Sequence, residues 1–348
     1  MMAYLQIFQR NSKGLKKLKK SQNKNIFIVE YQIGFSNFFF KEIESFQPGE
    51  GNTEYEKLFE GVLLLKCRPE ILEKSSFVKR IAEVVITFDN FNELDALDPS
   101  YGQFYVRIRD SSDCHSTPDE RILGEKLGAK GRVNFKNPDN IFIAYHVKDV
   151  WYLGRQIYQA SYEKLQTRKA GMRPFFSPTS MDPRFARFCI NVADVPEGGT
   201  IMDPFCGTGG MLIEAGLLKY NVVGIDISQE MVLGTRLNLK FFGIHDYVVT
   251  RANFLEYSNS LKVDAIVTDL PYGRSSSRAG IETAELFSKL PQKIYQVLKD
   301  DGCLILVTNT TEFIHNFDNL FTILFTIPLT IHRSLTRYYI KMKKNIKD

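Results

Sequence analysis

The sequence has neither paired cysteines nor long apolar runs. Its five cysteines are scattered, and no Cys-x-x-Cys pair occurs. We therefore expect reduced thiols in a cytoplasmic protein that holds no structural zinc. The longest apolar stretches, near residues 61–65 and 321–329, are too short or too interrupted to span a bilayer. This pattern predicts no membrane partner.

Acidic side chains are missing from the first 24 residues, which carry seven lysines and arginines. No apolar signal-peptide core follows them, and a mitochondrial presequence would favour arginine and serine over lysine. Two interpretations stay open: a solvated basic flank, or weak contact with RNA phosphate. The net charge of +5 is compatible with a nucleic-acid partner but does not require one.

The first half of the chain reads as a small α/β region. The whole chain has 348 residues, which exceeds what one core normally supports, so we expect two or three domains. The segment 76–84 is predicted to form a helix. In the alternating segment 103–109, Val106 and Ile108 would face a core while Arg107 and Arg109 face solvent.

A glycine-rich turn organises the second half. Residues 200–203 form a short apolar strand, the chain turns through Gly207 and Gly209, and helical spacing resumes from Met211. Strand, glycine turn and helix are the nucleotide-binding opening of a doubly wound, Rossmann-like α/β sheet. Two phosphate signatures are absent: the turn does not end in Gly-Lys-Ser/Thr, and Leu212 replaces the third glycine of a dinucleotide site.

Acidic residues follow the first two strands of this region. A carboxylate at Asp203 repels a pyrophosphate but attracts an ammonium or a sulfonium, and S-adenosylmethionine carries both. Asp226 ends the next strand, where an acid can accept hydrogen bonds from both ribose hydroxyls. We therefore predict S-adenosylmethionine as the cofactor; the alternative is an ordinary Rossmann-like turn with core glycines. The predicted cofactor residues are Asp203, Phe205, Gly207, Gly209, Asp226, Ile227, Asn253 and Asp269.

The motif Asp269-Leu270-Pro271-Tyr272 comes directly after an apolar strand. It resembles the (D/N)PPY motif of S-adenosylmethionine-dependent amino-group methyltransferases. An exocyclic base amine is a poor nucleophile, because its lone pair is conjugated into the ring. The Asp269 carboxylate and the Leu270 carbonyl can hold its two N–H bonds, Pro271 fixes the backbone, and Tyr272 offers a face for stacking. Alone, the same four residues are also an ordinary turn.

Several further stretches resemble segments of known protein families, and together this resemblance covers nearly the full length of the chain. FYVRIRD, ERILGEKL and GRVNFKNPDNIF resemble a THUMP domain, a small RNA-binding module of tRNA-modifying enzymes. RPFFSPTSMDPRFARFCINVADV and HRSLTRYYI resemble archaeal THUMP-containing tRNA (guanine-10-N2)-methyltransferases. The resemblance implies methyl transfer to a guanine N2 amine in tRNA, by a protein that needs no metal and acts as a monomer, with a small activating partner left open.

The same resemblance implies a domain order and further site residues. Residues 1–55 would form a ferredoxin-like region, 56–160 the THUMP domain, 161–176 a linker, and 177–348 a seven-stranded Rossmann-like methyltransferase domain. Thr179 and Ser180 would bind the carboxylate at the cofactor's methionine end, or alternatively cap a helix. RNA contacts would come from Arg107, Lys130, Arg132, Lys136 and Arg274, where a solvated charged face is the alternative.

Three other functions stay open on the sequence. The chain could methylate a different RNA guanine, or adenine N6 in DNA, although its THUMP-like residues argue against DNA. It could also be a tRNA-binding factor that keeps the fold without the activity, although the intact Asp-Leu-Pro-Tyr motif argues against that.

Overall fold

The protein divides into two compact units, one up to Ala160 and one from Ser161. The structure is a computed structural model that describes residues 25–46, 55–97, 102–110, 117–128, 131–178, 180–258, 261–271 and 283–346. The basic flank at residues 1–24 lies outside the described residues. Within those residues, no helix is both long and apolar enough to cross a membrane.

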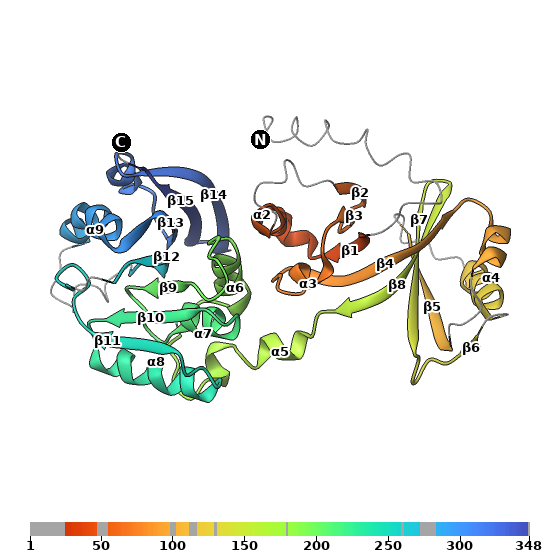
Figure 1. Ribbon diagram of the computed structural model, residues 1–348, viewed down its shortest axis with the longest axis horizontal. Coiled ribbons are helices and arrows are strands. Elements are labelled where there is room, and N and C mark those ends of the chain that lie inside the picture. The colour runs from red at the N-terminus through yellow and green to blue at the C-terminus, as the bar shows by residue number, and fades with distance from the viewer. Residues whose placement is uncertain are drawn as a thin grey trace. The chain divides into compact units, whose positions relative to one another are not determined.

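The first unit contains an eight-stranded sheet in the order β2-β3-β1-β4-β8-β7-β5-β6 (Figure 1). Its strands are β1 (Ile26–Tyr31), β2 (Tyr55–Phe59), β3 (Val62–Lys66), β4 (Val78–Phe88), β5 (Gln103–Asp110), β6 (Arg132–Val133), β7 (Asn140–Val147) and β8 (Val150–Gln159). Its helices are η2 (Ile33–Phe35), α2 (Ser36–Phe46), α3 (Pro69–Leu72), η3 (Phe91–Ala96) and α4 (Thr117–Gly128). The one sheet continues across the predicted boundary at residue 55, so the ferredoxin-like and THUMP divisions stay predictions.

The predicted helix over residues 76–84 is wrong, because strand β4 begins at Val78 and residues 76 and 77 are not helical. Residues 78–88 pair with β1 on one side and β8 on the other. The β-branched run Val84-Val85-Ile86-Thr87 favours a pleated strand. The prediction for residues 103–109 is confirmed: Val106 and Ile108 are buried while Arg107 and Arg109 are exposed.

The second unit contains a sheet of seven strands, which is the predicted number, and their order is β11-β10-β9-β12-β13-β15-β14. Its strands are β9 (Thr200–Asp203), β10 (Asn221–Asp226), β11 (Tyr247–Arg251), β12 (Val263–Asp269), β13 (Leu298–Thr308), β14 (Phe321–His332) and β15 (Leu335–Lys344). Its helices are α5 (Tyr162–Gln166), η4 (Ala170–Met172), α6 (Pro183–Asn191), α7 (Gly210–Leu217), α8 (Gln229–Phe241), α9 (Thr283–Val297) and η6 (Ile314–Phe317).

The strand order of the second sheet reverses between β9 and β12. The chain runs outward from β9 to β10 and β11, and then returns to place β12 on the other side of β9; the four junctions from β11 to β13 are parallel. Open α/β sheets bind ligands outside the carboxyl ends of their strands at such a switch point. The fold thereby positions the ends of β9, β10 and β12 next to one another, where this rule predicts a ligand crevice.

Helices cover both faces of this sheet (Figure 1). On one face, Leu286, Leu290 and Ile294 of α9 pack with η6 and with Ile266 and Leu304 in one apolar cluster. On the other face lie α6, α7 and α8. Helix α6 buries Phe185 and Phe188 as its spacing predicts, and Asp182 caps its first turn by accepting from the N–H of Arg184 at 2.9 Å.

Candidate active site

The turn between β9 and α7 requires its glycines. Gly207 and Gly209 have φ values of 51° and 81°, in the left-handed region that other residues rarely adopt. A Cβ on Gly209 would lie 2.9 Å from Cγ2 of Thr235. Gly209 is the N-cap of α7, and no side chain caps this helix. The first N–H groups of α7 are therefore available to a ligand.

Asp226 ends β10 and fixes this turn. Its Oδ2 accepts from the N–H of Gly207 at 2.9 Å, and its Oδ1 accepts from the N–H of Ser228 at 2.8 Å. Burial raises the pKa of Asp226, and the backbone donors lower it. Each carboxylate oxygen keeps a second acceptor site, so Asp226 can still accept from a pair of hydroxyls. Ile227, directly after it, is 40% exposed.

Asp203 ends β9 and is buried, with 3% of its surface exposed. Its Oδ1 accepts from Oγ1 of Thr268 at 2.7 Å and from the N–H of Phe205 at 3.1 Å. The pKa of Asp203 is raised to about 7, mainly by burial. The two donors lower this pKa, and the Asp269 and Asp226 carboxylates raise it. A buried acid with this pKa is ready to pair with a ligand cation.

Asp269 ends β12, so the three acids follow three neighbouring strands. Its Oδ2 lies 3.5 Å from Nη2 of Arg337 on β15. Its Oδ1 is buried and has no hydrogen-bond partner among the described residues. Burial raises the pKa of Asp269 to about 6, and the Arg337 guanidinium lowers it. A buried acceptor without a partner is costly unless a ligand supplies the donor.

The backbone beyond Asp269 is held to the next strand. The N–H of Leu270 donates to the carbonyl of Val307 on β13 at 2.9 Å, and the Leu270 side chain is 1% exposed. Pro271 is the last described residue of the motif. Four predicted site residues lie outside the described residues: Thr179, Lys130, Tyr272 and Arg274.

The remaining predicted cofactor residues also lie close to the turn or to the strand ends. The hydroxyl of Ser180 lies 3.0 Å from that of Thr208, and Thr208 belongs to the glycine turn. The ring of Phe205 packs edge-on against Phe254 at 6.1 Å between centroids. Asn253, just after β11, accepts through Oδ1 from the N–H of Leu255 at 3.1 Å. Its side chain therefore acts as an acceptor here.

Sequence reasoning did not identify two arginines near this crevice. Arg337 faces Asp269, and Arg173 lies beside the first residue of α7, Gly210. Arg337 stands in HRSLTRYYI and Arg173 in RPFFSPTS. Both segments resemble the family, and an arginine within such a segment is the signal that would have found them. Neither residue stood out, because both depend on contacts with strands or helices far away in the sequence.

The predicted RNA-binding residues of the first unit gather at the β5–β6 edge. Arg107 of β5, Arg132 of β6 and Lys136 are all exposed. The guanidinium of Arg107 lies 5.6 Å from the ring centroid of Phe135, which stacks on Tyr105 at 5.8 Å. Phe135 is 63% exposed. The sequence analysis did not predict this aromatic pair, although an aromatic residue next to basic ones is a stacking signal.

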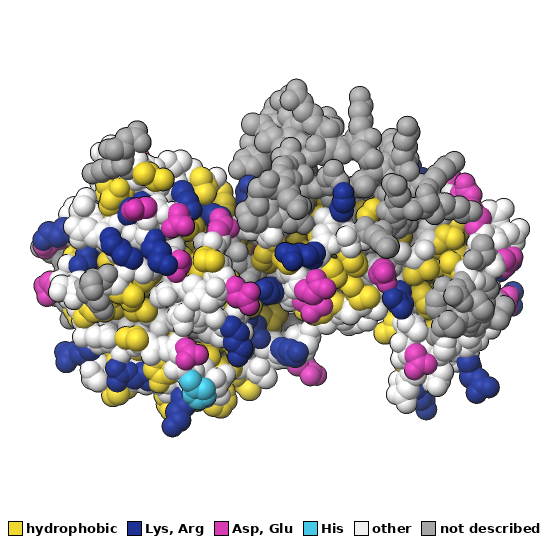
Figure 2. All heavy atoms as spheres, in the orientation of Figure 1, with side chains coloured by type: hydrophobic (Ala, Val, Ile, Leu, Met, Phe, Trp, Pro, Cys, Tyr) yellow, Lys and Arg dark blue, Asp and Glu magenta, His cyan; other side chains and the backbone are white. Residues whose placement is uncertain are grey.

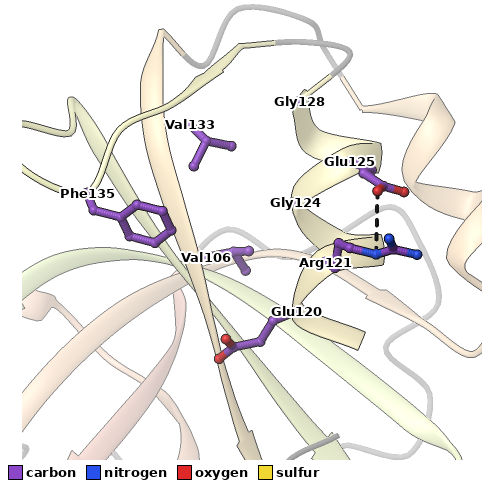
Figure 3. A pocket seen from close by; sticks show the side chains of 8 residues that line it. All are labelled: Val106, Glu120, Arg121, Gly124, Glu125, Gly128, Val133 and Phe135. Carbon is purple, nitrogen blue, oxygen red and sulfur yellow. Dashed lines mark ion pairs between the residues drawn. The ribbon is translucent and has the colours of Figure 1, made fainter. Parts of the chain in front are cut away.

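A pocket of about 580 Å³ adjoins the same edge (Figure 3). Phe135 and Val133 face it from one side, and Glu120, Arg121 and Glu125 of α4 face it from the other. Its acidic wall does not suit phosphate. On the face drawn in Figure 2, basic and acidic side chains of the described residues alternate rather than forming one basic area.

The crevice of the second unit fits S-adenosylmethionine. A sulfonium or an ammonium suits a buried carboxylate such as Asp203, and a ribose suits paired acceptors such as the two oxygens of Asp226. No group of histidine, cysteine or acidic residues suited to a metal occurs among the described residues. Fold and site together define the second unit as an α/β S-adenosylmethionine-dependent methyltransferase domain.

Comparison with known proteins narrows this class. The family model of the RMKL-like methyltransferase domain matches residues 170–337. The tRNA (guanine(10)-N2)-dimethyltransferase of Methanothermobacter thermautotrophicus is 38% identical over 240 residues, which are 67% of this chain and 71% of that protein. The enzyme of the same name from Pyrococcus abyssi is 32% identical over 306 residues, 84% of this chain and 88% of that protein. The chain belongs to the tRNA (guanine(10)-N2)-dimethyltransferase family.

A solved structure has the same fold over almost the whole chain. TrmN from Thermus thermophilus aligns with 92% of this chain and 100% of its own, with a TM-score of 0.53 and 17% identity. The likeness concerns the fold alone, and it extends over both units.

Proposed function

We propose that this protein transfers the methyl group of S-adenosylmethionine to the exocyclic N2 amine of guanine 10 in tRNA. The observation that supports this most is the Oδ1 of Asp269 at the switch point of the sheet, which is buried and has no hydrogen-bond partner in the described part of the chain. The relatives' names state the same substrate position and favour dimethylation.

The chain's own groups would hold the amine for attack. Asp269 Oδ1 accepts one N–H bond of the amine, the Leu270 carbonyl accepts the other, and Tyr272 stacks on the base. Arg337 occupies the neighbourhood of Oδ2, which leaves Oδ1 for the substrate. The nitrogen lone pair forms a bond to the methyl carbon while the carbon–sulfur bond breaks, and the surplus amine proton leaves to Asp269 or to water.

The cofactor would lie across the ends of β9 and β10. Asp226 accepts from the ribose hydroxyls, Asp203 pairs with the ammonium, and Asn253 accepts from the adenine amine. Gly207 and Gly209 allow close approach of the backbone. Phe205, Ile227, Thr179 and Ser180 would complete the pocket around the cofactor.

The first unit would bind the tRNA. Arg107, Lys130, Arg132 and Lys136 contact phosphates there, and Arg274 adds one contact in the second unit. We propose residues 1–55 and 56–160 as ferredoxin-like and THUMP regions, 161–176 as a linker, and a monomeric cytoplasmic enzyme.

The test is nucleoside mass spectrometry of unmodified tRNA incubated with the purified protein and S-adenosylmethionine, followed by mapping of the modified position. We expect N2-methylated or N2,N2-dimethylated guanosine at position 10. Asp269→Asn should lower the rate by about 100-fold or more while tRNA binding is retained. The matched control Asp246→Asn, on an exposed side chain, should leave the rate unchanged. Methylation at another nucleotide, or full activity of Asp269→Asn, would refute the proposal.

A further inference from the structure

A buried guanidinium lies beside the first turn of α7. Arg173 is 4% exposed, and its Nε donates to the carbonyl of Arg168 at 2.8 Å. Its Nη1 lies 3.5 Å from the position that a Cβ on Gly210 would take. Neither Nη1 nor Nη2 has a hydrogen-bond partner among the described residues. Such donors are rarely left unpaired in an interior.

The acid nearest to Arg173 is already engaged by two other arginines. Glu214 on α7 is fully buried, and it accepts from Nε of Arg168 at 2.7 Å and from Nε of Arg187 at 2.7 Å. Glu214 attracts the Arg173 charge, but no hydrogen bond joins them. Three guanidinium groups therefore share one carboxylate, and the N-terminus of α7 adds further positive potential. Among the described residues, no acid is hydrogen-bonded to Arg173.

Acids also adjoin the glycine turn. Asp203 precedes the turn, and Asp226 accepts from the N–H of Gly207 within it. The turn is therefore flanked by two carboxylates and by the Arg173 guanidinium beside Gly210. A ligand that spans it must carry a cation at one end and an anion at the other, as an α-amino acid does. The methionine end of S-adenosylmethionine has both groups on one carbon.

We infer that Arg173 binds the carboxylate of the cofactor's methionine end through Nη1 and Nη2. The planar guanidinium presents two parallel donors that match the two carboxylate oxygens. The first N–H groups of α7 complete the anion site. Arg173 is then a cofactor-binding residue of this domain, and the inference depends on the use of S-adenosylmethionine proposed above.

The test compares two ligands by calorimetry. S-adenosylhomocysteine has the carboxylate, and its decarboxylated analogue, S-adenosyl-3-thiopropylamine, lacks only that group. Arg173→Met should weaken binding of S-adenosylhomocysteine by about 30-fold or more and binding of the analogue by less than about twofold. The control Arg184→Met removes an arginine of the same segment that pairs with Asp182, and it should change neither affinity. Equal losses for both ligands would show that Arg173 only supports the fold, and would overturn the inference.

A measurement on the unaltered protein keeps the inference testable if Arg173→Met does not fold. The wild-type protein should bind S-adenosylhomocysteine about 30-fold or more tightly than the decarboxylated analogue, and Arg173→Lys should reduce this ratio. Equal wild-type affinity for both ligands would overturn the inference without touching the proposed reaction. Failure to bind either ligand would instead remove the cofactor assignment on which both proposals depend.

Discussion

At the scale of single residues, the acids of the crevice combine burial with a shortage of partners. Asp203 has two donors on one oxygen, and Asp269 has an oxygen with none. In both, burial is the main cause of the raised pKa. Each carboxylate can regain stabilisation from a positively charged or hydrogen-bonding ligand. Their environment therefore links ligand binding to proton release.

Binding of the cofactor should depend on pH through Asp203. Its pKa of about 7 without ligand means that the carboxyl is largely protonated below this pH, whereas the ammonium of the cofactor requires the ionised form. The ligand therefore releases a proton, and its affinity should fall by about tenfold per pH unit below 7. Calorimetry with S-adenosylhomocysteine from pH 5.5 to 8 measures this.

The control for this prediction is the isosteric variant Asp203→Asn. It should bind more weakly at pH 8, and its affinity should vary much less between pH 5.5 and 8. A wild-type affinity that stays flat over the same range would mean that Asp203 does not meet a cation.

At the scale of elements, the positions of the three acids at strand ends could be predicted from the sequence, whereas the roles of the two arginines could not. Asp203, Asp226 and Asp269 each follow directly after an apolar strand, so the sequence alone places them at the carboxyl ends of strands. Arg173 and Arg337 acquire their roles only through tertiary contacts, which no local pattern encodes. The mistaken helix at residues 76–84 has a related cause: its apolar spacing suits a helix, and pairing with strands on both sides decides otherwise.

Glu214 should be a main support of the α6–α7 layer. It joins α7 to α6 through Arg187, and to the segment before α6 through Arg168, without exposure to solvent. Glu214→Gln removes the buried charge and leaves two half-buried arginines uncompensated, so we expect a loss of about 3 kcal/mol in the free energy of unfolding. Urea denaturation measures it. Glu256→Gln, on an exposed side chain, should change stability by less than about 0.5 kcal/mol; a similar loss in both variants would contradict the prediction.

At the scale of the whole molecule, our proposal assigns RNA binding and cofactor binding to two units with separate cores. The first would bind RNA at its β5–β6 edge, and the second would bind the cofactor. The sequence located both units through motifs. It did not locate the Tyr105–Phe135 pair, because stacking between a strand residue and a loop residue depends on how the chain folds back.

Phe135→Ala should weaken tRNA binding without changing cofactor binding. If the ring stacks on an unpaired base, its loss should weaken tRNA binding by about fivefold or more, while affinity for S-adenosylhomocysteine stays unchanged. Filter binding with unmodified tRNA and calorimetry measure the two effects. The control Phe241→Ala removes an aromatic ring of similar exposure, 59%, from the second unit, and should leave tRNA affinity intact. Unchanged tRNA affinity in Phe135→Ala would exclude the ring from the RNA surface.

Strand β15 lies between β13 and β14 and runs opposite to both. Among the described strands it is made last by the ribosome, yet it occupies an interior position in the sheet and carries Arg337. A nascent chain that ends before residue 335 would therefore expose two unpaired strand edges and lack the cation that faces Asp269. Methylation competence should arise only after β15 has been made, so a chain that stops before this strand would be inactive as well as prone to aggregate.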